Sequence, residues 1–128
     1  MDKKTFTLSD EQRLRREAQV RLAEEVRSLL KQDERERLHW TGTTTDLIEA
    51  LHVASETGLV TDDEGNPLSF MQIVKRACLI LHHRVPGNPY DTAMRGHRRK
   101  GVLRHNYEDR YCYLVGTGRE QPFFDCII

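Results

Sequence analysis

The fold class of this chain depends on residues 111–128, YCYLVGTGREQPFFDCII. Residues 111–115 are aromatic or aliphatic apart from one cysteine, and residues 123–128 form a second apolar run. Gly116 and Gly118 lie between the two runs, where glycine permits a tight turn. Two short apolar runs on either side of a glycine-rich turn are typical of a β-hairpin. This stretch therefore predicts a C-terminal β-hairpin with residues 116–119 at its tip.

The sequence before this stretch predicts four helices, each with its own start signal. The first helix is long and charged, and its apolar stripe is narrow. At its start, Ser9 and Gln12 have the spacing of a capping box. Capping residues at the right distance from an apolar pattern also begin the other three. We expect the four helices at residues 9–38, 43–58, 69–82 and 88–100, with one short strand at 59–61.

This order of elements predicts a mainly helical α+β fold. We expect a single domain over residues 1–128, in which the long charged N-terminal helix (9–38) precedes a winged helix-turn-helix-like module (39–128). The helix at 88–100 is then the recognition helix, and the C-terminal β-hairpin is the wing. Many small domains share this order of elements, so function has to be argued from particular residues.

Composition and charge exclude several classes of protein. The chain has 128 residues with 20 basic and 20 acidic side chains, so its formal net charge is zero. The last third departs from this balance, because residues 84–128 carry 8 basic against 5 acidic side chains. The sequence has neither a signal-peptide pattern nor an apolar stretch long enough for a bilayer, and its three cysteines are widely spaced. We expect a cytoplasmic protein with reduced thiols and no membrane partner.

Basic residues cluster in the predicted fourth helix and just after it. At 100° per residue, Arg95, Arg98 and Arg99 fall on one face of that helix. Arginine can donate two hydrogen bonds to a guanine edge, and any basic side chain can neutralise a phosphate. We predict that Arg95 and Arg98 read bases, whereas the alternative is that the whole face is merely solvated. The predicted DNA-binding residues are Arg95, Arg98, Arg99, Lys100, Arg104 and, at the tip of the wing, Arg119.

The sequence carries no complete catalytic or metal-binding signature. Cys78 and His82 are four residues apart, but no Cys-x-x-Cys or His-x-x-x-His pair completes a zinc site. Tyr107 and Tyr111 lie near basic residues, as the nucleophile of a tyrosine recombinase does, but no His-x-x-Arg accompanies them. Glycine-rich phosphate loops and Gly-x-Ser-x-Gly are absent as well. We therefore predict a protein that is not an enzyme and that uses no metal and no cofactor.

Residues 40–49 carry a pattern that resembles a known family. Trp40-Thr41-Gly42-Thr43-x-x-Asp46-Leu47-Ile48-Glu49 is similar to the Trp-Thr-Gly-Ser-x-x-Asp-Leu-Val-Glu motif of the RteC family. That family regulates the excision of conjugative transposons in Bacteroides and its relatives. A looser similarity through residues 90–92 and the basic segment 95–100 extends the resemblance over roughly residues 38–105. The chain departs from the family in its shorter N-terminal region and in its predicted C-terminal hairpin.

The resemblance implies a DNA-binding transcription regulator of winged-helix type. Within the motif we expect Trp40 to dock the long first helix, Gly42 to supply a backbone angle, and Thr43 and Asp46 to cap a helix. The predicted function is regulation of a mobile genetic element through binding to double-stranded DNA. The alternative is an interaction module of the same ancestry that does not bind DNA. Such a module binds a protein partner or a second copy of the chain through the N-terminal helix.

Overall fold

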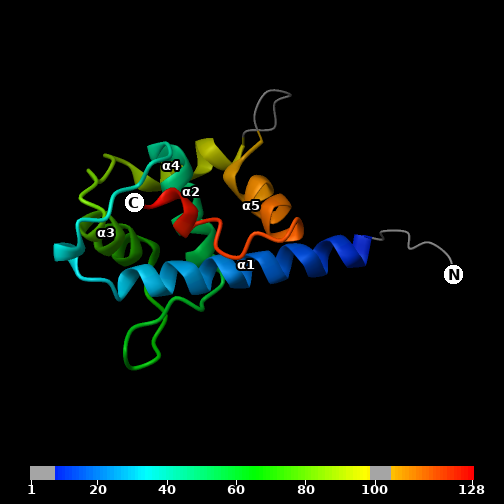
Figure 1. Cartoon of the computed structure of the whole chain (residues 1–128), viewed down its shortest axis with the longest axis horizontal. Coiled ribbons are helices and arrows are strands. Elements are labelled where there is room, and N and C mark those ends of the chain that lie inside the picture. The colour runs from blue at the N-terminus through cyan, green and yellow to red at the C-terminus, as the bar shows by residue number, and fades with distance from the viewer. Residues whose placement is uncertain (1–7, 99–104) are drawn as a thin grey trace, which may run out of the picture.

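Five α-helices arranged around α2 make up the part of the chain that the computed structural model describes, residues 8–98 and 105–128 (Figure 1). Two short 3-10 helices, η1 and η2, lie in the connections. The elements in chain order are α1 (Leu8–Leu30), η1 (Glu34–Glu36), α2 (Thr44–Glu56), α3 (Phe70–Ile80), α4 (Pro89–His97), α5 (Tyr107–Gly116) and η2 (Phe124–Cys126).

Helix α2 is central because most of its side chains are buried, including the carboxylates of Asp46 and Glu49. A helix with an apolar stripe on one face lies at a surface, whereas one that is buried on most sides lies inside the bundle. Each of the other four helices contacts α2, and α1 runs along one side of the resulting bundle (Figure 1). The buried residues of α2 are Asp46, Leu47, Ile48, Glu49, Ala50, Leu51, Val53 and Ala54.

The predicted helices at 43–58, 69–82 and 88–100 correspond to α2, α3 and α4. Their predicted N-caps are confirmed, since the side chains of Thr43, Ser69 and Asn88 each accept a hydrogen bond from the amide three residues later. The predicted strand at 59–61 is reduced to a single bridge between Thr61 and Pro67. The N-terminal capping signals are therefore stronger guides to this fold than its β-propensities.

The first predicted helix is wrong at both ends. Helix α1 already includes Leu8, one residue before the predicted cap, and it ends at Leu30 rather than at residue 38. The guanidinium of Arg76 donates to the carbonyl oxygens of Leu30 and Gln32, which satisfies acceptors at the end of the helix. The chain then turns into η1, whose cap is Asp33.

The predicted β-hairpin is wrong, and with it the winged-helix assignment. Residues 107–116 form the helix α5, residues 124–126 form η2, and no strand occurs in residues 8–98 or 105–128. A cap explains the difference, because the Asn106 side chain accepts from the amide of Asp109 and begins a helix. Tyr107 and Tyr111 then lie one turn apart on a buried face, and this packing overrides their preference for strands.

The C-terminal segment packs against residues 39–41. The amide of His39 donates to the carbonyl of Ile128, and the amide of Ile128 donates back. This pairing forms an isolated antiparallel bridge between Trp40 and Ile127. The Trp40 ring lies 5.2 Å from the Phe123 ring, and its indole N–H donates to the carbonyl of Thr43. Trp40 is thus buried as expected, but it docks the C-terminal segment.

Buried carboxylates hold α5 and the C-terminal segment on the bundle. Glu25 of α1 accepts hydrogen bonds from the Tyr111 hydroxyl and from the amides of Phe123 and Phe124. Asp46 of α2 accepts from the guanidinium of Arg110 at 2.6 Å. Burial raises the pKa of the Glu25 carboxyl above its usual value, although its hydrogen bonds oppose that rise.

Helix α4 approaches α2 closely at Gly96. A Cβ at this position would lie 2.7 Å from the Thr45 methyl carbon and 3.1 Å from a carboxylate oxygen of Glu49. Contacts this short force one of the two helices to move. Gly96 is therefore required for the position of α4 on α2.

We expect Gly96→Ala to lower the free energy of unfolding by about 1–3 kcal/mol, because the added methyl group overpacks the contact between α2 and α4. Gly116→Ala is the matched control, since a Cβ there has no described heavy atom within 4 Å. It should be neutral or stabilising by up to about 1 kcal/mol through helix propensity. Urea unfolding followed by circular dichroism measures both, and equal effects of the two variants would contradict the close contact.

The raised pKa of Glu25 predicts a specific pH dependence of stability. The folded chain holds this proton more tightly than the unfolded chain, so the free energy of unfolding falls as pH rises from about 4.5 through the raised pKa. Glu25→Gln removes the titration. The stability of the natural chain relative to this variant should therefore decrease with rising pH, as urea unfolding at a series of pH values would show. A difference that is constant with pH would disprove the shift.

Candidate nucleic-acid interface

Helix α4 buries one face against α2 and exposes the opposite one. Asn88 caps the helix and Pro89 occupies its first turn, as the sequence predicts. Pro89, Thr92, Ala93 and Gly96 are buried, whereas Arg95 is exposed on the outer side. The helical spacing of the sequence predicts a packing face of Tyr90, Ala93, Met94, His97 and Gly101. Gly101 lies outside the described residues, and of the other four only Ala93 is fully buried, so the buried face is displaced around the helix.

The three predicted DNA-binding residues that the structure describes, Arg95, Arg98 and Arg119, lie at two separate places. Arg95 and Arg98 are exposed at the C-terminal end of α4, where Arg98 is the residue after the last helical turn. Arg99, Lys100 and Arg104 lie outside the described residues. Arg119 lies just beyond the C-terminal end of α5, whereas Asn106 and the α4–α5 corner lie at its N-terminal end. The helix between them is about 15 Å long. Instead of lying at the tip of a wing, Arg119 pairs with Asp125 at 2.8 Å.

An acidic neighbour accompanies Arg95. Its Nε atom lies 3.1 Å from a carboxylate oxygen of Asp91, one turn earlier on the same exposed face. An exposed pair of this kind contributes at most about 1 kcal/mol to stability. The pairing does, however, neutralise part of the charge that a phosphate would meet, so Asp91 competes with any anion for Arg95.

The corner between α4 and α5 is fixed on both sides of residues 99–104. The Asn106 side chain donates to the carbonyl of His97 at 2.9 Å, which ties the end of α4 to the start of α5. The buried carboxylate of Glu49 accepts from the amides of Tyr107 and Glu108. These bonds satisfy first-turn donors that would otherwise lack partners. The end of α4 and the start of α5 are thus fixed relative to each other, and the connecting residues Arg99, Lys100 and Arg104 lie outside the described residues.

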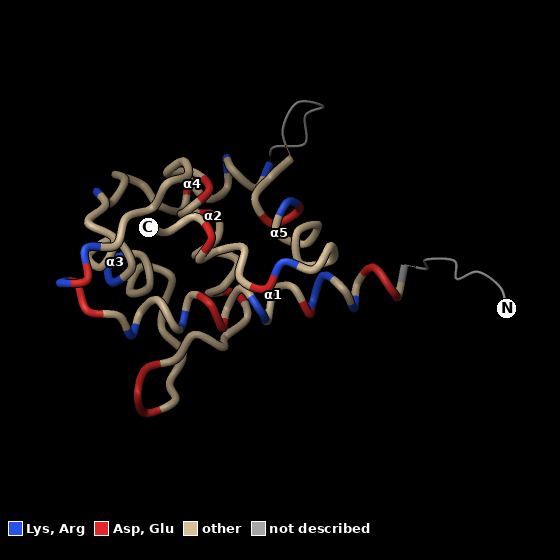
Figure 2. The backbone as a smooth tube through the Cα atoms, in the orientation of Figure 1, with Lys and Arg blue, Asp and Glu red and all other residues tan. Residues whose placement is uncertain are grey.

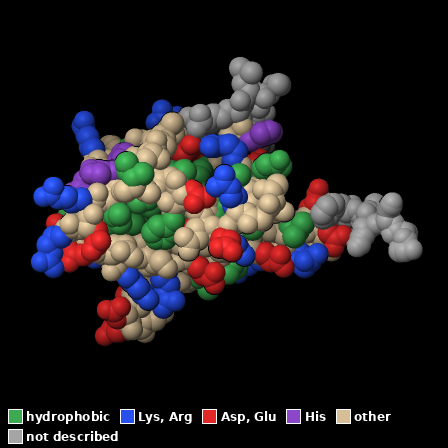
Figure 3. Space-filling view, viewed as in Figure 1, with side chains coloured by type: hydrophobic (Ala, Val, Ile, Leu, Met, Phe, Trp, Pro, Cys, Tyr) green, Lys and Arg blue, Asp and Glu red, His purple; other side chains and the backbone are tan. Residues whose placement is uncertain are grey.

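Charge is unevenly distributed over the molecule. The acidic turn Asp62-Asp63-Glu64 projects from the side of α1 opposite to α4 and the α4–α5 corner (Figure 2). In space-filling view, basic side chains occur at the left end and along the upper edge, and acidic ones cover the projection below (Figure 3). A polyanion that approaches the chain is therefore favoured at the α4 side, although the net charge is zero.

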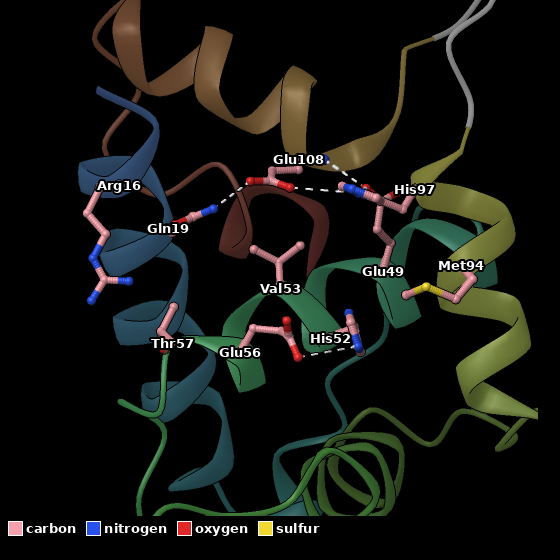
Figure 4. A pocket seen from close by; sticks show the side chains of 10 residues that line it. All are labelled: Arg16, Gln19, Glu49, His52, Val53, Glu56, Thr57, Met94, His97 and Glu108. Carbon is pink, nitrogen blue, oxygen red and sulfur yellow. Dashed lines mark hydrogen bonds and ion pairs between the residues drawn. The ribbon is translucent and has the colours of Figure 1, made fainter. Parts of the chain in front are cut away.

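A cavity of about 320 Å³ lies between α1, α2, α4 and α5 (Figure 4). The carboxylates of Glu49 and Glu108 lie on one wall with His97, whose Nδ1 atom is 3.5 Å from Glu49 and 3.7 Å from Glu108. The side chain of Gln19 also donates to Glu108 at 2.8 Å. These polar contacts connect α1, α2, α4 and α5. The cavity is lined by Arg16, Gln19, Glu49, His52, Val53, Glu56, Thr57, Met94, His97 and Glu108.

The cysteine and histidine side chains lie at separate places in the described part of the chain. Burial raises the pKa of the Cys78 thiol to about 11, which disfavours the thiolate that metals and electrophiles require. The ring of His82 instead donates to the carbonyl of Glu34. Within residues 8–98 and 105–128, no group of three or more His, Cys, Asp or Glu residues is placed to hold a metal ion. No helix in that part of the chain is long and apolar enough to cross a bilayer.

The residues that most strongly organise this region are ones that the sequence analysis missed. Glu49, only 1% exposed, stands at the centre of the corner, yet it was noted only as part of the motif at residues 40–49. The available signal was its position at the middle of the apolar segment Leu47-Ile48-Glu49-Ala50-Leu51. A carboxylate in such a helix must find hydrogen-bond partners inside the fold.

The remaining motif residues also have structural roles. Gly42 lies against the Trp40 ring, where a Cβ would be 3.0 Å from the indole nitrogen, and Thr43 caps α2. Asp46 pairs with Arg110 and thereby fixes α5. No family model, no curated protein and no solved structure matches the chain, so the resemblance to the RteC family remains a prediction from the sequence.

Proposed function

We propose that the chain is a regulatory protein that binds double-stranded DNA at the α4–α5 corner. The observation that carries this proposal is the exposure of Arg95 and Arg98 at the end of α4, directly before a segment with three more basic residues. The resemblance to regulators of mobile elements supports the same assignment. Because the net charge is zero, the affinity has to come from this local cluster.

The placement of the arginines favours contacts with phosphates over contacts with bases. Recognition helices usually insert their N-terminal residues into the major groove. The first turn of α4 instead carries the exposed carboxylate of Asp91, whereas Arg95 and Arg98 lie at the other end. We therefore propose that the two arginines position the backbone of the duplex. This replaces the expectation that they read bases.

Binding to a pool of random duplexes at several salt concentrations tests the proposal. Affinity should fall steeply with salt, since each phosphate contact releases condensed counterions. Absence of salt-sensitive binding even at low ionic strength would reject it. That result would favour the alternative function, a protein-interaction module that uses the exposed side chains near the N-terminus of α1.

Replacing Arg98 with alanine should weaken binding to all duplex sequences alike. One lost phosphate contact reduces the slope of log K against log salt by about one unit and leaves sequence preference unchanged. Fluorescence anisotropy with several duplexes measures both quantities. Arg119→Ala is the control, because Arg119 is paired with Asp125 beyond the other end of α5. If Arg98→Ala instead changes the ranking of sequences, the arginine reads bases and the phosphate assignment is wrong.

Replacing Asp91 with asparagine should strengthen binding, because it releases Arg95 from its ion pair and removes a negative charge beside the phosphates. Asp63→Asn changes the net charge equally but lies in the acidic turn on the opposite side (Figure 2). We expect a tighter complex and a steeper salt slope for Asp91→Asn only. Equal gains for both variants would mean that overall charge, rather than the α4 surface, controls binding.

A further inference from the structure

A shallow groove of about 680 Å³ lies on the outer side of α5, next to the proposed DNA surface. It is lined by Arg15, His105, Asp109, Arg110, Tyr113 and Leu114. Tyr113 is 70% exposed, which is unusual for a large aromatic ring in a helix that packs on a bundle. His105 precedes Asn106, whose side chain bonds to the carbonyl of His97 at the end of α4, so the groove reaches the α4–α5 corner. Hydrophobic, basic and histidine side chains lie side by side over α5 in Figure 3.

The two arginines of the groove are held in fixed positions. Arg15 lies 2.7 Å from Asp109 and 3.1 Å from Glu108, so it bridges α1 and α5. Arg110 donates to Asp46 and to the carbonyl of His105, and its guanidinium lies over the Tyr107 ring. These contacts hold each guanidinium in place, so both side chains lose little conformational freedom when a ligand binds.

We propose that this groove receives an unpaired nucleotide of the bound DNA, with its base stacked on Tyr113 and its phosphate facing Arg15 and Arg110. This inference rests on the proposed function and specifies the form of DNA that is preferred. An exposed aromatic ring offers a stacking surface to any base, and flanking cations follow the backbone, which is the usual construction of a site for single-stranded nucleic acid. Two arginines and one carboxylate line the groove, since Arg15 and Arg110 stand beside Asp109, which pairs with Arg15.

The groove should distinguish unpaired from paired nucleotides rather than one base from another. Stacking on a tyrosine tolerates any base, so little sequence preference is expected from this contact. A fully paired duplex keeps its bases stacked within the helix and cannot place one on Tyr113. The groove therefore distinguishes a blunt duplex from one that ends in, or contains, an unpaired nucleotide.

The test compares two fluorescent duplexes of identical sequence at low salt, one blunt and one with a short single-stranded overhang. The natural chain should bind the overhang duplex more tightly. Tyr113→Ala should reduce that preference about tenfold, as expected for the loss of one base–aromatic stack. Tyr113→Phe should retain it, because phenylalanine keeps the ring. Leu79→Ala, at an exposed apolar residue of α3, is the control and should leave it unchanged. Circular dichroism verifies that each variant is folded.

Several outcomes would overturn the inference. If the natural chain binds the blunt duplex with no preference for the overhang, the groove does not hold an unpaired nucleotide and the proposed function survives. If Tyr113→Ala keeps the preference, another surface provides it. If Tyr113→Phe loses as much of the preference for the overhang as Tyr113→Ala does, the tyrosine hydroxyl makes the contact, and the proposed stacking on the ring is wrong. A chain that binds neither duplex at low salt overturns the proposed function itself.

Discussion

The carboxylate of Glu49 is the interaction on which the α4–α5 side of this fold depends. It is buried on the central helix, it accepts the first two amides of α5, and it lies against Gly96 and His97 at the end of α4. An ionised group in such a position is tolerated only when donors surround it. The same group therefore determines both where α5 begins and how closely α4 approaches. The positions of the end of α4 and the start of α5 are a consequence of that arrangement.

The two faces of helix α5 have different roles, one in packing on the bundle and the other in the proposed groove. Its inner face carries Tyr111, whose hydroxyl bonds to the buried Glu25. Its outer face carries Tyr113, and Arg110 at the edge between the two faces bonds to Asp46 and lines the groove. Rigid anchoring of the inner face makes the outer face a preformed surface, which lowers the entropic cost of holding a ligand.

The sequence was most informative where a local interaction decides the structure. The caps at Thr43, Ser69 and Asn88 involve residues only three apart, and they located α2, α3 and α4 correctly. Residues 111–115 were mistaken for a strand because their β-propensity is local, whereas the carboxylate that buries Tyr111 lies 86 residues away. The cap at Asn106 was the local signal that would have corrected this prediction. For the candidate site, the pattern located the arginines of α4, but not the acid that pairs with Arg95 or the groove around Tyr113.

The bonds of Glu25 also determine the order in which the chain can fold. Its partners are the side chain of Tyr111 and the amides of Phe123 and Phe124, which lie 86 to 99 residues further along. During synthesis α1 and α2 can associate early, but this carboxylate lacks its partners until those residues emerge. Helical proteins fold fastest when their contacts are local, and contacts over this distance slow the search. Glu25 therefore gains its full set of hydrogen bonds only after residues 123 and 124 have been synthesised and have docked.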